Sequence, residues 1–138
     1  MSSYLTFYLV PKGEDKKPLT FTSYSRNNDV YQSYYEELNP AYIGNDDEPN
    51  YTELTPKKAL QVVNAAKDNL KKAEKALNNR ISAYKELNDT SEEAIQDIAS
   101  TREYIEELKE GLAELQYIYN WVSDIEYSDF EKVLINID

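Results

Sequence analysis

The chain has 138 residues, of which 41% are apolar and 30% are charged, and its 26 acidic side chains outnumber 15 basic ones. It contains no Cys and no His, which excludes disulfides, thiolate chemistry and the common zinc, haem and iron–sulfur ligand sets. A formal net charge of −11 disfavours direct binding to nucleic acid or to anionic lipid. This length suits a single domain that covers residues 1–138.

The sequence shows no sign of membrane targeting. No basic region precedes the first apolar run, and no segment approaches the roughly 20 apolar residues that a membrane span requires. We therefore expect a cytoplasmic protein without a membrane partner.

Two strands are predicted at the N-terminus. Residues 4–10 are rich in aromatic and β-branched side chains, and their alternation places Leu5, Phe7 and Leu9 on one face. Residues 19–24 have a similar composition and follow a charged turn that lies between two prolines. The two segments together predict a β-hairpin.

A short helix is predicted over residues 28–38. Asn28 or Asn27 can cap it, Asp29 suits the positive end of the helix dipole, and Pro40 ends the run. Apolar and aromatic side chains recur in this segment at helical spacing, namely at Val30, Tyr31, Tyr34, Tyr35 and Leu38.

The segment after this helix, residues 40–55, is an acidic loop. Its carboxylates are ligands of the type that calcium and magnesium prefer, and they are Asp46, Asp47, Glu48 and Glu53. The stretch 45–53 lacks the alternating oxygen ligands and the central Gly of an EF-hand loop. We therefore expect a solvated loop and no metal site.

Two long helices, residues 56–87 and 91–125, dominate the rest of the chain. Their apolar side chains recur every three or four residues, which is close to the heptad pattern of a coiled coil. A short turn joins them, so they predict an antiparallel helical hairpin. Each begins with a start signal: Thr55 followed by Pro56, and Thr90 with Glu93 as a capping box.

The two apolar seams align when Leu70 lies beside Leu108 and Val63 lies beside Leu115. At nearly the same register, basic side chains of the first helix face acidic ones of the second. The predicted pairs are Lys67–Glu110, Lys71–Glu106, Lys75–Glu103, Arg80–Asp97 and Lys85–Glu92. This pairing accounts for much of the acidity of the second helix, and it weakens the hypothesis that the chain mimics nucleic acid.

Residues 132–137 return to strand composition, and the N-terminal strands offer them a sheet to join. We therefore predict an α+β fold with a three-stranded antiparallel sheet, one short helix and the helical hairpin. The strands are expected near 4–10, 19–24 and 132–137, and the helices at 28–38, 56–87 and 91–125. This prediction divides the chain into a head, residues 1–54 plus 127–138, and a helical arm, residues 55–126.

Two candidate binding features follow from these elements. The strand–helix turn at residues 23–28 offers Ser25, Arg26 and Asn28 for contact with a small anion or a nucleotide, although it lacks the glycines of a phosphate-binding loop. The 13 tyrosines indicate a protein-binding surface, because Tyr is enriched at interfaces. We expect that surface at Tyr31, Tyr34, Tyr35, Tyr42, Tyr51 and Trp121.

The sequence contains no nucleophile elbow, dinucleotide fingerprint or P-loop, so we expect no enzymatic activity and no cofactor. The favoured hypothesis is a non-enzymatic protein-interaction or accessory protein that self-associates through the hairpin. Its small size, acidity and excess of Lys over Arg are typical of proteins that phages and mobile elements encode. One alternative is an acidic inhibitor that mimics nucleic acid on a host enzyme. The other is a small-anion or nucleotide binder at residues 23–28.

Overall fold

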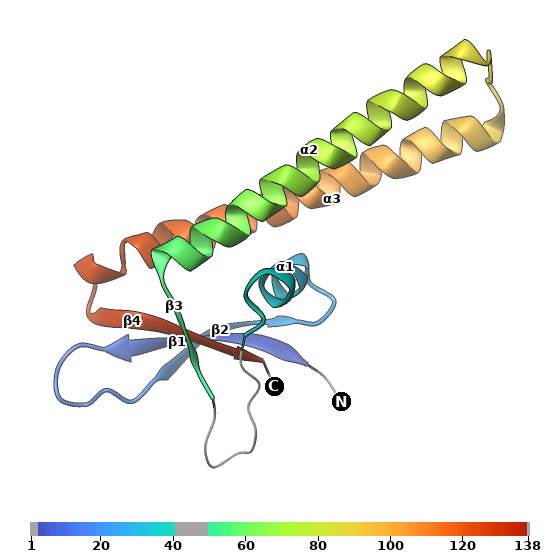
Figure 1. The fold of residues 1–138 in the computed structure, drawn as a ribbon. Helices are drawn as coiled ribbons and strands as arrows, with labels where there is room; N and C mark the ends of the chain where they lie inside the picture. Colours follow the sequence, from blue (N-terminus) through green and yellow to red (C-terminus); the bar gives the residue numbers. More distant parts are fainter. Residues whose placement is uncertain (1–2, 41–49, 138) are drawn as a thin grey trace.

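The computed structural model describes residues 3–40 and 50–137, and it has an α+β architecture with the α-helices on one side of an antiparallel sheet (Figure 1). A helical hairpin crosses above the sheet and extends well beyond it. The strands are β1 (Tyr4–Pro11), β2 (Leu19–Ser25), β3 (Thr52–Leu54) and β4 (Phe130–Ile137). The helices are α1 (Asp29–Leu38), α2 (Pro56–Glu86), α3 (Glu92–Ser123) and the short 3-10 helix η1 (Ile125–Tyr127).

The sheet has the strand order β2-β1-β4-β3, and every neighbouring pair is antiparallel. β1 and β4 lie in the centre, with Leu5 opposite Ile137 and Phe7 opposite Ile135, so the first and the last strand lie side by side (Figure 1). The three predicted strands are confirmed. The predicted strand number was wrong, because β3 forms a fourth strand within the predicted loop of residues 40–55. A three-residue strand is too short to show an alternating pattern in the sequence.

The core lies between the sheet and the helices. Leu5 and Phe7 of β1 and Ile135 of β4 are fully buried together with Tyr34 of α1. The ring of Phe7 makes edge-to-face contacts with Tyr34 at 5.4 Å and with Trp121 of α3 at 6.0 Å. Such aromatic pairs contribute beyond the apolar area that they bury. The alternation of β1 therefore delivers one face of the strand to the core.

Two of the predicted helix caps are confirmed. The side chain of Asn28 accepts a hydrogen bond from the backbone N–H of Val30 at 2.8 Å, and α1 begins at the next residue after Asn28. Thr55 Oγ1 accepts from the backbone N–H of Lys58 at 3.2 Å at the start of α2. Both caps satisfy amide groups that have no partner within their own helix.

The predicted cap of α3 was wrong by one residue. Ser91, and not Thr90, is the N-cap, and its hydroxyl accepts from the backbone N–H of Ala94 at 3.2 Å. The carboxylate of Asp89 accepts the Ser91 N–H at 2.9 Å, and the hydrogen bonds from Ser91 lower the pKa of Asp89. This hydrogen bond extends the turn by one residue, to Ser91, so α3 begins one residue later than the sequence pattern predicts.

The arm formed by α2 and α3 is packed tightly at its root, where it lies against the head. Val63 and Leu115 belong to the buried core there. Between residues 67 and 111, by contrast, the buried side chains are those of Ala94 and Ile105 alone. Two helices without a third layer leave part of each seam in contact with water. We call residues 67–111 the free half of the arm.

The predicted register is confirmed near the tip of the arm, where Arg80 and Asp97 form an ion pair at 3.0 Å. The other four charge pairs, whose residues are all described, are not formed. They are Lys67–Glu110, Lys71–Glu106, Lys75–Glu103 and Lys85–Glu92. Glu106 pairs instead with Lys109 of its own helix at 3.3 Å. Of the basic side chains in the five predicted pairs, Arg80 is therefore the one that forms an ion pair with the second helix.

The difference between the root and the free half of the arm can be measured by matched truncations. Leu115 is buried, so Leu115→Ala should lower the free energy of unfolding by about 2–5 kcal/mol, because it leaves a cavity in the core. Leu70 is partly exposed, so Leu70→Ala should cost only about 1–2 kcal/mol. Urea denaturation followed by circular dichroism measures both. Equal costs would show that the free half is packed as tightly as the root.

Candidate functional site

A shallow apolar groove runs between α2 and α3 in the free half of the arm. Ala73 and Ala76 of α2 and Tyr104 of α3 line it, and Arg80 and Asp97 lie at its tip end. The groove has a volume of about 310 Å³. The Tyr104 side chain is 55% exposed, although its ring is large and apolar. We call this feature the apolar groove.

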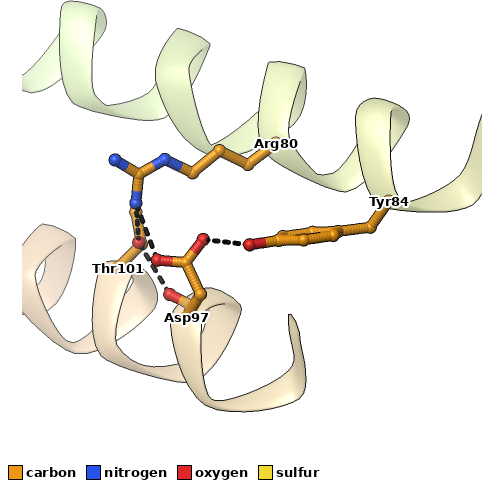
Figure 2. Close-up of polar contacts among 4 residues, drawn as sticks. All are labelled: Arg80, Tyr84, Asp97 and Thr101. Atoms are coloured by element: carbon orange, nitrogen blue, oxygen red, sulfur yellow. Dashed lines mark hydrogen bonds and ion pairs between the residues drawn. The ribbon is translucent and has the colours of Figure 1, made fainter. Parts of the chain in front are cut away.

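A polar cluster fixes the tip end of the apolar groove (Figure 2). The carboxylate of Asp97 accepts hydrogen bonds from Arg80 Nη1 at 3.0 Å and from the Tyr84 hydroxyl at 2.7 Å. Arg80 also donates to Thr101 Oγ1 at 2.9 Å, and Thr101 donates to the Asp97 carbonyl at 2.8 Å. The hydrogen bond to Asp97 raises the pKa of Tyr84. The cluster therefore ties α2 to α3 where few apolar contacts hold them.

A second hollow, of about 280 Å³, lies where the N-terminus of α1 meets α3. Four carboxylates line it, those of Asp29, Glu107, Glu110 and Glu114. Within the described part of the chain, none of these four forms an ion pair with a Lys or Arg side chain. We call this feature the acidic hollow. No basic side chain of the described residues neutralises its negative charge.

Two contacts shape the acidic hollow. Gly111 allows α1 and α3 to approach closely, because a Cβ atom at this position would lie 3.2 Å from the Cβ of Asp29. The Tyr24 hydroxyl donates a hydrogen bond to Glu114 Oε1 at 2.6 Å and so orients that carboxylate. Burial, followed by this hydrogen bond, raises the pKa of Tyr24 well above its ordinary value.

The structure separates the residues that were predicted to contact an anion. Arg26 lines a hollow of about 190 Å³ together with Tyr31 and Tyr35. Asn28 caps α1 and lines the acidic hollow instead. Ser25 is the last residue of β2, and its carbonyl accepts from the Asn28 N–H at 2.9 Å. A small anion would therefore meet Arg26 without Asn28 beside it, and binding at this turn stays a prediction.

The residues predicted to form an aromatic partner surface divide between the core and the exterior. Tyr34 and Tyr31 are buried, at 0% and 6% exposure, and Trp121 is packed against the core. The burial of these three side chains in or against the core explains their presence without a partner surface. Among the others, Tyr35 and Tyr51 are exposed, and Tyr42 lies outside the described residues.

The acidic loop offers little evidence of a metal site. Asp46, Asp47 and Glu48 lie outside the described residues, and Glu53 is part of β3. Among the residues that the structure describes, no three carboxylates come close enough together to hold a metal ion. Within the described segments, no helix is both long enough and apolar enough to cross a membrane.

Neither the apolar groove nor the acidic hollow was predicted from the sequence. Their characteristic α3 residues lie beside the seam: Tyr104 precedes Ile105, and Glu107 precedes Leu108. One signal was present, because Tyr104, Glu107, Gly111 and Glu114 recur at the helical spacing of three or four residues and so share a face. Which partner that face meets depends on where α1 packs, which no local pattern specifies.

No family model, curated protein or solved structure matches this chain. Function is therefore inferred from the geometry of the arm and the head.

A double-mutant cycle tests the polar cluster at the tip. The Arg80 and Asp97 side chains are 50% and 36% exposed, so their coupling free energy should be only about 0.2–1 kcal/mol. Lys71 and Glu106 form no ion pair, and their cycle should give a coupling close to zero. Urea denaturation of the single and double alanine variants measures both. A larger coupling for Lys71 and Glu106 than for Arg80 and Asp97 would contradict this assignment of the cross-helix charge pairs.

The buried Tyr34 and the half-buried Tyr24 predict a loss of stability at high pH. Burial raises the pKa of Tyr34 and contributes most to the raised pKa of Tyr24, whose ordinary value is 10.0. The folded protein therefore keeps protons that the unfolded chain releases. This stability is fully present below the ordinary tyrosine pKa and is lost as the pH rises from there through the folded-state pKa.

We expect the free energy of unfolding to fall as the pH rises above about 10. The fall should be shallower in the Tyr24→Phe/Tyr34→Phe variant, which has neither phenol. Urea denaturation across this pH range measures both slopes. Identical slopes in the two proteins would contradict the assignment to Tyr24 and Tyr34.

Proposed function

We propose that this chain is a non-enzymatic protein-interaction protein and that the free half of the arm binds its partner. The apolar groove is the observation that carries the proposal. Ala73, Ala76 and Tyr104 present apolar surface to water at a place where the chain itself supplies no covering layer. Exposed apolar surface rimmed by polar side chains is typical of protein-binding sites.

The chemistry of the groove suits a protein partner better than a small molecule. Tyr104 is an aromatic side chain with two rotatable bonds, so it offers a large contact area at a small cost in entropy. The groove between two helices is also shaped for a third helix, which is a common mode of peptide recognition.

The energetics of the fold support the same proposal. The core cluster between the sheet and the helices includes no residue between 67 and 111, where only Ala94 and Ile105 are buried. The head is therefore stabilised with little contribution from the free half of the arm. The two helices nevertheless continue, with α2 31 residues and α3 32 residues long, and the Arg80–Asp97 cluster holds their tips together. The free half of the arm is therefore helical although it adds little to the core, and its surface is available to bind a partner protein.

A shortened arm tests the proposal. Removing residues 74–80 together with 98–104 takes one heptad from each helix, keeps the seam in register and eliminates the apolar groove. This variant should fold, as judged by circular dichroism, but should no longer retain the partner that the full-length chain isolates from a lysate of its source cells. Retention of the same partner by the shortened chain would contradict the proposal.

A pair of substitutions provides a matched control in case the shortened arm does not fold. Ala76 lines the apolar groove, and Asn78 lies on the opposite side of the arm, and both are exposed. Ala76→Glu should therefore weaken retention of the partner, whereas Asn78→Glu should leave it unchanged.

The acidic hollow favours a second candidate function, that of an acidic inhibitor of a nucleic-acid-binding enzyme. Only one of the five predicted cross-helix charge pairs forms, so the second helix keeps most of its negative charge free. This function requires a basic partner that is released by salt and by added nucleic acid. The same isolation distinguishes the two, because a partner held by apolar contacts would be retained in salt.

A further inference from the structure

We propose that the occupant of the apolar groove is an amphipathic helix of a partner protein, with apolar side chains toward the tip of the arm and Lys or Arg side chains toward the head. This inference rests on the proposed function and adds the chemistry of the partner. It follows from the position of the acidic hollow relative to the apolar groove.

The two features lie end to end on one face of α3. Asp97, Ser100 and Tyr104 line the groove, and Glu107, Gly111 and Glu114 line the hollow. Successive members of this series are three or four residues apart, so they form a single stripe along the helix. At 1.5 Å per residue the stripe is about 26 Å long, which is the length of about 17 residues of helix.

The head closes one end of this stripe. α1 crosses α3 at Gly111 with Asp29 in close contact, and Trp121, further along α3, packs against Phe7 and Phe21 of the sheet. The layer that the head places on the root of the arm therefore stops at the acidic hollow. A helix lying in the apolar groove would continue that layer toward the tip and cover the exposed ring of Tyr104.

The charge at the head end specifies what that helix carries. Asp29, Glu107 and Glu110 have no cationic partner among the described residues, and Glu114 has the Tyr24 hydroxyl as its hydrogen-bond donor. A helix that brought Lys or Arg to this end would neutralise these carboxylates, and one that brought Asp or Glu would be repelled. The stripe thus discriminates by charge at one end and by apolar contact at the other.

A second copy of the chain does not match this face. With the two arms antiparallel, α2 would lie on α2, and residues 55–87, which contain α2, carry a formal charge of +5. With the two arms parallel, the two heads would occupy the same space, because each head covers this face of its own arm (Figure 1). Self-association through the opposite face of the hairpin stays a prediction.

A designed peptide tests the inference directly. The probe is a fluorescein-labelled helix of about 17 residues with a Leu stripe and with Lys confined to its last two turns, and its twin has Glu in place of Lys. Fluorescence anisotropy at low salt should show binding of the Lys peptide and none of the Glu peptide. Binding should weaken as salt is added.

Matched variants locate the peptide. Glu107→Lys and Tyr104→Ser should each raise the dissociation constant of the Lys peptide by about tenfold or more. Glu106→Lys makes the same charge change outside the stripe, where Glu106 lines a different hollow, and Tyr127→Ser removes another exposed ring. Both variants should stay within about twofold of the parent chain. All four positions are exposed, which allows each variant to fold.

Three results would overturn the inference: no binding of the Lys peptide, equal binding of the Glu peptide, or equal losses in Glu106→Lys and Glu107→Lys. The last would indicate diffuse attraction to an acidic chain. The proposed function fails separately, namely when the shortened arm still retains the natural partner. If the Lys peptide does not bind but the shortened arm still loses the natural partner, the arm remains the binding element and only the basic helix is rejected.

Discussion

The pairing of β4 with both β1 and β3 is the constraint on which the rest of the structure depends. β3 leads through the Thr55 cap directly into α2, and β4 receives the chain from α3 through η1. Because β3 and β4 are adjacent strands, the two ends of the arm are held side by side on the sheet. The ladder between β1 and β4 then joins this pair to the first strand of the chain. The antiparallel register of a long hairpin is in this way fixed at its root.

The same constraint explains why the arm is uneven along its length. Val63 and Leu115 at the root have the sheet beneath them and are buried. Further out, each helix has only the other to pack against, and two helices expose part of their seam to water. The Arg80–Asp97 cluster keeps the tips together with hydrogen bonds where apolar burial is small. The open face of the free half is therefore a direct consequence of a head that covers only the root.

The parts of the fold that could be predicted from the sequence are those set by local pattern. The seam spacing and the Thr55 cap depend on residues a few positions apart, and the helices and the cap that they predict were confirmed. On β1, Leu5 and Phe7 lie in the core as predicted, but the burial does not alternate strictly, because Thr6 and Val10 are buried too. β3 was missed because three residues carry no period, and four charge pairs were predicted wrongly because sequence register does not say which side chains point away from the partner helix. The acidic hollow requires α1 to pack at Gly111, which is a contact between distant segments.

Native-state hydrogen exchange measured by NMR tests most directly the central claim that the head stabilises the root of the arm and leaves its outer part to other contacts. The account predicts two classes of amide. Those of β1, β4 and the root, near Val63 and Leu115, should exchange only through global unfolding. Those of residues 67–111 should exchange through a local opening of lower free energy. Equal protection along the whole length of α2 and α3 would contradict it.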